Sequence, residues 1–138
     1  MSGQKPLKYT VEVERVDEHG SVARCKQAEV ILDTGLPGRA DAFNPAELLL
    51  AALAACMVKG IERVTPMLKF EYRRVHIHLH GIRQDAPPLM SQITYEIQID
   101  TEESDHRLEL LHGNVKKYGT VFNTVARGTT LIGTIRRT

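Results

Sequence analysis

The chain has 138 residues, the length of one folded domain, and we expect a single domain over residues 1–138. Its 18 basic and 17 acidic side chains leave a formal charge of +1 with no basic block, which argues against a nucleic-acid partner. The longest apolar run, from Leu48 to Val58, is shorter than the roughly 20 residues that cross a bilayer, and residues 1–6 lack the apolar segment of a signal peptide. We therefore expect a cytoplasmic protein without a membrane partner, whose two cysteines are reduced at rest.

Three strands are predicted before the first helix. Residues 9–16 largely alternate apolar and polar side chains, which is the period of a half-buried strand, and a turn follows at 17–20. Residues 21–25 and 28–33 look like two further strands of an antiparallel meander. Residues 34–43 form a loop that is long enough to lie over a site.

A central helix is predicted from Pro45 to about Val64, with Pro66 as its stop. Asn44 is a good N-cap, and Pro45 suits the first helical position because its missing N–H would be unpaired there in any case. Glu47 stands where its carboxylate can reach back to the cap and meet the positive end of the helix dipole.

The body of this helix is apolar apart from one thiol. From Leu48 to Val58 the only polar side chain is Cys56, so we expect the helix to be buried on every side. The nearest cation along the helix is Lys59, one turn further on, which can favour a thiolate. Cys56 is either inert packing or a protected nucleophile, and the residues alone leave both open.

Two long strands follow the helix. Residues 69–83 alternate, with a slip in phase near Arg73 and Arg74 that suggests a bulge. Residues 92–101 alternate cleanly, and a turn at 85–89 predicts a long hairpin between the two strands.

The last third is predicted to contain a helix from Ser104 or Asp105 to about Gly119, a short helix over 121–126 and a strand over 129–135. The order of strands, helix, strands, helix and strand indicates an α+β fold, with helices packed on an antiparallel sheet.

Three histidines alternate along the predicted strand that follows the central helix. His76, His78 and His80 share one strand face, and His76 and His80 are too far apart to complete one metal site together. No carboxylate or cysteine nearby in sequence completes a tetrahedral set. We interpret these side chains as a polar outer face and expect no metal.

The run Asn-Pro-x-Glu-Leu-Leu-Leu-Ala-Ala-Leu-Ala-Ala-Cys, at residues 44–56, resembles the central-helix motif of the OsmC/Ohr family of thiol-dependent hydroperoxide reductases. The resemblance extends over nearly the whole chain. It implies an α+β OsmC-like domain with an antiparallel sheet on a long central helix. It also implies an intertwined homodimer with its active site at the subunit interface.

The resemblance further implies that Cys56 is the peroxidatic cysteine, which a hydroperoxide converts into a sulfenic acid. The family's second, resolving cysteine follows the second helix in a segment similar to Lys-Tyr-Cys-Pro-Val-Ser, and Gly119 occupies its position here. An external thiol is then the expected reductant. Cys25, in a predicted strand, is the alternative resolving thiol or else an inert strand cysteine.

The family also uses an arginine to stabilise the thiolate. Among Arg15, Arg24 and Arg39 we favour Arg24 and Arg39, which flank the segment leading into the helix. The organic-hydroperoxide branch carries a catalytic Glu directly after Asn-Pro, where this chain has Ala46. Glu47, one residue later, is the remaining candidate, although it lies about 180° round the helix from Cys56, as suits a cap.

The function implied is reduction of a hydrophobic organic hydroperoxide by Cys56, without a cofactor, as part of an oxidative-stress response. The alternative is a non-catalytic binding protein with the same fold, in which Cys56 is a relic that lines an apolar pocket for a small ligand.

Overall fold

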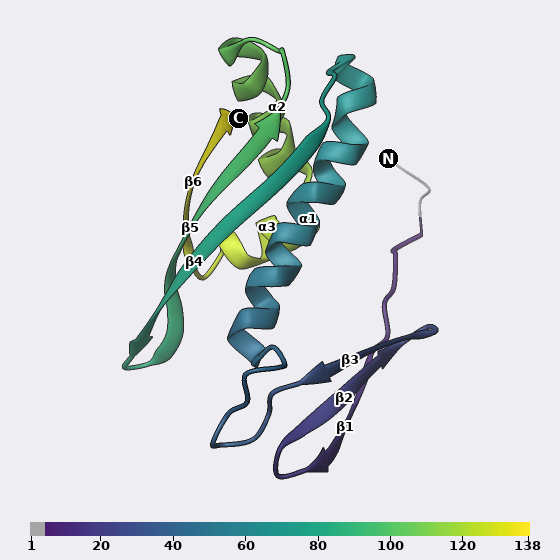
Figure 1. Cartoon of the computed structure of the whole chain (residues 1–138), viewed down its shortest axis with the longest axis vertical. Helices are drawn as coiled ribbons and strands as arrows, with labels where there is room; N and C mark the ends of the chain where they lie inside the picture. The colour runs from purple at the N-terminus through teal and green to yellow at the C-terminus, as the bar shows by residue number, and fades with distance from the viewer. Residues whose placement is uncertain (1–4) are drawn as a thin grey trace. The chain divides into compact units, whose positions relative to one another are not determined.

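The computed structural model describes residues 5–138, and its contacts divide the chain into two compact units. The first unit ends at Leu48 and the second begins at Leu49, and each contains a three-stranded sheet (Figure 1). Mixed strands and helices in this order confirm the predicted α+β class.

The sheet of the first unit is the predicted antiparallel meander, in the order β1 (Glu12–Asp17), β2 (Gly20–Cys25) and β3 (Ala28–Leu32). The prediction that the first strand begins at residue 9 was wrong, because pairing with β2 starts only at Glu12. Every residue of β1 is exposed within this chain. Alternation alone therefore overstated the length of this strand.

Helix α1 (Pro45–Leu68) begins as predicted, with a reciprocal cap. The backbone N–H of Asn44 donates to Glu47 Oε1 over 2.9 Å, and the N–H of Glu47 donates to Asn44 Oδ1 over 2.8 Å. Two donors that the helix leaves unpaired are satisfied in this way. In residues 5–138 no helix is both long and apolar enough to cross a membrane.

The predicted stop of α1 at Pro66 was wrong, because the helix continues to Leu68 with the proline inside its last turn. A proline there removes one backbone hydrogen bond, and the following residues supply others. Lys69 takes a left-handed conformation with φ of 52°, and the N–H of Phe70 donates to the carbonyl of Thr65 over 2.9 Å. This is the closing bond of a Schellman motif.

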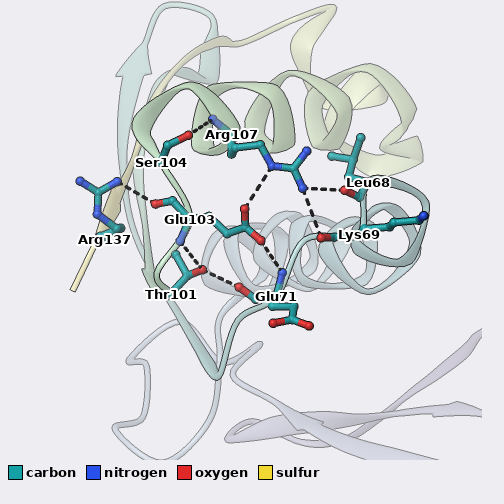
Figure 2. Close-up of polar contacts among 8 residues, drawn as sticks. All are labelled: Leu68, Lys69, Glu71, Thr101, Glu103, Ser104, Arg107 and Arg137. Atoms are coloured by element: carbon teal, nitrogen blue, oxygen red, sulfur yellow. Dashed lines mark hydrogen bonds and ion pairs between the residues drawn. The ribbon is translucent and has the colours of Figure 1, made fainter.

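The end of α1 is also capped by a side chain from the second unit's other long helix, α2 (Asp105–Tyr118). Figure 2 shows Arg107 of α2 donating to the carbonyls of Leu68 and Lys69, over 2.6 and 3.2 Å. Glu103 orients this guanidinium through a 3.1 Å ion pair. A positive charge at this place suits the negative end of the α1 dipole.

The second unit's sheet contains the predicted hairpin, formed by β4 (Arg74–Asp85) and β5 (Pro88–Asp100). The bulge lies between Ile82 and Arg83, so its predicted place near Arg73 and Arg74 was wrong. Arg73 precedes the strand, and its backbone N–H still reaches the Asp100 carbonyl over 2.8 Å. The phase slip in the sequence therefore marks the beginning of β4.

Strand β6 (Thr130–Arg137) pairs with β5 in parallel, which corrects the prediction of a wholly antiparallel sheet. Helices α2 and α3 (Thr120–Ala126) make the crossover that a parallel pair requires. The Ser104 hydroxyl caps α2 by accepting from the N–H of Arg107, as predicted. Gly119 joins α2 to α3.

The core of the second unit lies between one face of this sheet and the helices. Tyr95 of β5 lies directly across from Gly133 of β6, where any Cβ would overlap the tyrosine ring. Glycine at this place lets the ring turn inward without displacing β6. The buried residues of the core are Leu53, Met57, Ile61, Val64, Phe70, Ile93, Tyr95, Ile97, Ile99, Leu108, Leu111, Val115 and Phe122.

One side of α1 is not covered by the rest of the second unit. Ala52, Ala55 and Val58 are exposed, and Val58 keeps 41% of its surface. The second unit by itself therefore does not bury the helix on every side.

Candidate functional site

Cys56 lies at the boundary between the buried and exposed sides of α1 and is itself half-buried. Leu53 and Gly60, one turn away in either direction, are buried, whereas Ala52 and Lys59 are exposed. The thiol therefore packs against the core on one side and faces solvent on the other. This placement combines protection with access, which a reactive thiol requires.

The buried side of the thiol meets the junction between α2 and α3. A Cβ built on Gly119 would lie 3.1 Å from Cys56 Sγ, 3.0 Å from Phe122 Cβ and 3.2 Å from the carbonyl oxygen of Val115. Bond lengths within a disulfide place each Cβ about 3.0 Å from the opposite sulfur. Position 119 is therefore placed as a disulfide partner of Cys56 would be, although it carries no side chain.

The same two helices also approach each other one turn further along. A Cβ on Gly60 would come within 3.5 Å of the Val115 side chain. Gly60 follows Cys56 by four residues, whereas Val115 precedes Gly119 by four, so α1 and α2 run in opposite directions at this contact. Small residues on α1 permit the close approach that brings Gly119 to the thiol.

A buried polar pair, which was not predicted from the sequence, packs against the α2–α3 junction. The Tyr95 hydroxyl and His112 Nε2 are 2.7 Å apart, and the Tyr95 ring meets the Phe122 ring edge-on. Burial raises the pKa of Tyr95 to about 12. Burial, together with the charge of Lys116, lowers the pKa of His112. The sequence does indicate that His112 is buried, because this residue lies on the apolar stripe of α2.

Arg24, the first candidate partner of the thiolate, belongs to an ion-pair network across the first sheet. Its guanidinium lies 2.7 Å from Glu29 and 3.3 Å from Glu14, on the two neighbouring strands. These hydrogen bonds, that from Glu29 above all, raise the pKa of Arg24. Arg24 therefore holds three strands together and already has two carboxylate partners.

Arg39, the second candidate, lies in the loop between β3 and α1. Its Nε and Nη2 donate to the two carboxylate oxygens of Asp41, over 2.6 and 3.0 Å, which raises the pKa of Arg39 and lowers that of Asp41. Its Nη1 passes over Gly20, where an added Cβ would lie 3.0 Å away. The carboxylate that pairs with the Arg39 guanidinium comes from its own loop, and the Arg39 backbone N–H donates to Asp33 Oδ2 over 3.2 Å.

The other candidates are also placed within their own units. The Glu47 carboxylate is engaged in the helix cap described above. Cys25 is half-buried at the end of β2, paired in register with Ala28. Its ability to resolve Cys56 stays a prediction.

The three histidines occupy the exposed face of β4, as predicted from their alternation. Across the sheet, His76, His78 and His80 lie beside Gln98, Glu96 and Thr94. Within residues 5–138 no group of three metal-ligating side chains comes together.

Comparisons with known proteins agree on one family. The family model described as OsmC-like protein matches residues 38–132, which include α1 and Cys56. No curated protein matches the chain.

Among solved structures, the chain is similar to the OsmC-like protein of Mycoplasma pneumoniae, with a TM-score of 0.88 and 19% identity over 96% of this chain and 99% of that one. It is also similar to the organic hydroperoxide resistance protein OsmC of Legionella pneumophila, with a TM-score of 0.76 and 15% identity over 96% and 98%. OhrB of Bacillus subtilis, an organic hydroperoxide resistance protein, gives a TM-score of 0.71 and 9% identity over 94% and 98%. Identities this low establish the fold, and the family model, which covers most of the chain, establishes membership: the chain belongs to the OsmC-like family.

Proposed function

We propose that the protein reduces organic hydroperoxides through Cys56 and takes part in the response to peroxide stress. The observation that carries the proposal is the position of the thiol, half-buried on α1 and 3.1 Å from the Cβ position of Gly119. The resemblance places the second thiol of related proteins at this residue. Two solved relatives are named organic hydroperoxide resistance proteins.

In the proposed reaction the Cys56 thiolate attacks one oxygen of the hydroperoxide, and the oxygen–oxygen bond breaks. The alkoxide takes up a proton and leaves as an alcohol, while Cys56 becomes a sulfenic acid. The apolar side chains beside Cys56 favour a hydrophobic substrate. Since Gly119 offers no thiol, an external thiol returns Cys56 to its reduced form, and a reducing cytoplasm would supply one.

Arg39 is the better of the two proposed partners for the thiolate. Arg24 is held by carboxylates on two neighbouring strands, whereas the Arg39 guanidinium pairs, among the described residues, with the carboxylate of Asp41 in its own loop. A guanidinium can offer two parallel donors to the oxygens of a peroxide. Engaging the thiolate would require Arg39 to give up its two hydrogen bonds to Asp41, whose carboxylate is exposed.

The protein is further proposed to act as a homodimer. Ala55 and Val58 on α1 are exposed, and so are Val11, Val13 and Val16 near and within β1. Apolar surface of this extent, on both units, favours burial by a second copy. Sedimentation velocity at micromolar concentration tests this: a monomer at all concentrations would contradict it.

The catalytic proposal is tested by mixing the reduced protein rapidly with cumene hydroperoxide and following the loss of thiols. We expect one thiol per chain to disappear much faster than free cysteine reacts. Cys56→Ser should abolish this reaction, and Cys25→Ser, the matched control, should leave it intact. A rate no greater than that of free cysteine would refute the proposal.

A binding protein with a relic cysteine is the alternative, and Ala46 and Gly119 favour it because both family side chains are missing there. In that case Cys56→Ser would leave the binding of an apolar ligand unchanged, and the reduced protein would not consume hydroperoxide.

A further inference from the structure

We infer that the exposed face of β4 binds a divalent transition-metal ion between the imidazole of His78 and that of one neighbouring histidine. The two possible pairs are His76 with His78 and His78 with His80, and the second pair is preferred. The site is independent of the proposed function, because it belongs to the face of the sheet that is turned away from Cys56 and its helix.

The alternation of β4 separates a buried face from the face that carries the histidines. Val75, Ile77 and Leu79 pack against the core of the second unit, to which α1 also contributes. The three histidines between and beside them are exposed. The side of α1 that is proposed to contact a second copy is therefore across the sheet from these imidazoles.

Neighbouring outward residues of a strand have the spacing that a chelate needs. They lie about 6.6 Å apart along the strand. Two imidazole nitrogens bound to one ion at about 2.1 Å each are roughly 3 Å apart, so each ring leans towards the other by less than about 2 Å. Rotation about the side-chain bonds of an exposed histidine provides such a shift. His76 and His80, about 13 Å apart, cannot be bridged in this way.

Two imidazoles form an open site, in which water completes the coordination. Within residues 5–138 no three metal-ligating side chains come together, which argues against a closed tetrahedral site. The prediction of no metal from the sequence considered a closed site of that kind. A chelate of two histidines instead suits ions that favour imidazole nitrogen, above all Cu²⁺ and Ni²⁺.

The fold adds a carboxylate that is distant from the histidines in sequence. Glu96 of β5 lies directly across from His78, and residues paired in this way have Cβ atoms about 5 Å apart. Gln98 Nε2 and Arg136 Nε lie 2.6 and 3.2 Å from Glu96 Oε1. Oε2 accepts no hydrogen bond from the part of the chain that the structure describes. This oxygen adds negative charge beside the histidine that both pairs share.

The carboxylate of Glu96 is charged at neutral pH. Hydrogen bonds from Gln98 and Arg136, together with the charges of Arg136 and His78, lower its pKa. An anionic carboxylate next to an imidazole both attracts a cation and restrains the ring that binds it.

The register of the sheet favours the pair formed by His78 and His80. Both nearby cations are at the other end of the row, since Arg74 precedes His76 by two residues and Arg136 is in the same row as His76, across β5. The row of His80 continues instead with Thr94 and Ile132, which are uncharged. Repulsion from the two arginines is therefore weakest at His80.

The test titrates Ni²⁺ into the untagged chain and measures the affinity by isothermal titration calorimetry. A Cys25→Ser, Cys56→Ser background removes the two thiols, which would bind the ion themselves. We expect one Ni²⁺ to bind per chain. Mg²⁺, which prefers oxygen ligands, should not bind.

Substitutions distinguish a shared chelate from separate histidines. His78→Asn destroys both pairs and should weaken Ni²⁺ binding at least tenfold, because a second ligand held close by raises affinity by about that much or more. His80→Asn should have a smaller effect, and His76→Asn the smallest of the three. The double variant H76N/H80N leaves one imidazole and should match His78→Asn. His106→Asn, at an exposed histidine of α2, is the matched control and should change nothing.

Two further measurements do not depend on removing a histidine. Cu²⁺ at a small fraction of the protein concentration should broaden the imidazole NMR signals of His78 and His80 before that of His106, since paramagnetic broadening falls steeply with distance. Arg136→Gln should strengthen Ni²⁺ binding, because it removes a nearby positive charge.

Equal affinities of the parent and the His78→Asn variant would overturn the inference, and so would equal losses in His78→Asn and His106→Asn. Binding of Mg²⁺ as tight as that of Ni²⁺ would assign the ion to carboxylates and would also overturn it. The proposed function is tested separately by the hydroperoxide assay, in which the thiol of Cys56 reacts and the histidines of β4 take no part.

Discussion

Introducing a cysteine at Gly119 should convert Cys56 into one half of an internal disulfide. The Cβ of residue 119 would lie 3.1 Å from Cys56 Sγ, close to the 3.0 Å or so found across a disulfide. The variant is Gly119→Cys in a Cys25→Ser background, so that the two thiols at positions 56 and 119 are the only ones present. Oxidation should then link α1 directly to the α2–α3 junction.

The stabilisation follows from the length of chain that the bond would close. A loop of about 60 residues loses conformational entropy worth about 4 kcal/mol in the unfolded state. The new Cβ also lies close to Phe122 Cβ, at 3.0 Å, and to the Val115 carbonyl, at 3.2 Å, which offsets about 1 kcal/mol. A net gain of about 3 kcal/mol corresponds to a rise in Tm of about 10 °C for a chain of this size.

Thermal unfolding with and without a reductant measures this gain, and titration of free thiols shows whether the bond has formed. The reduced variant should be less stable than the parent by about 1 kcal/mol, because the strain remains without the bond. Gly119→Ala, the matched control, should match the reduced variant and should not respond to oxidation. Two thiols that persist after oxidation by diamide, or an unchanged Tm in the oxidised form, would refute the geometry on which the candidate site depends.

Three further changes test other parts of the structure. Arg107→Met removes a charged donor from two carbonyls at the end of α1, and urea unfolding should report a loss of about 2 kcal/mol. Burial lowers the pKa of His112, so the unfolded chain binds a proton more readily than the folded one. The free energy of unfolding should therefore be highest above about pH 6.5 and decline as the pH falls below it. His112→Gln should reduce this decline, as measured by urea titrations at about pH 7.5 and 5. Arg39→Met should slow hydroperoxide consumption at least tenfold, whereas Arg24→Met should leave the rate nearly unchanged; the opposite order would assign the thiolate partner to Arg24.

The elements of the fold could be predicted from the sequence wherever a local pattern determines them. The reciprocal cap of Asn44 and Glu47, the Ser104 cap and the long hairpin all depend on residues that are close in sequence or strictly alternating. The helix end predicted at Pro66 was wrong because a proline removes only one backbone hydrogen bond. The actual end of α1 is capped by Arg107, which is far away in sequence and could not be recognised from the local pattern. The parallel pairing of β6 likewise depends on the crossover through α2 and α3 and not on the pattern of β6 itself.

The candidate site, too, could be predicted from the sequence only in part. Cys56 was identified from its helix and from the family motif, and the missing thiol at Gly119 was visible in the sequence. That the two positions meet, with the separation of a disulfide, is a contact between segments far apart in the chain, and no local pattern encodes it. The role of His112 could not be predicted, because its hydrogen-bond partner, Tyr95, lies on a different element and is brought to it only by the fold.

The parallel pairing of β6 also bears on how the protein is made. Strand β5 ends at Asp100, and the strand that covers its second edge is not complete until Arg137. At ribosomal speeds of about 5–20 residues per second, β5 waits for a few seconds with one edge unpaired and with the Tyr95 ring lacking the glycine against which it packs. An open apolar edge of this kind recruits other strands. The nascent chain is therefore most prone to aggregate in this interval, and a chain cut short before β6 would remain in that state.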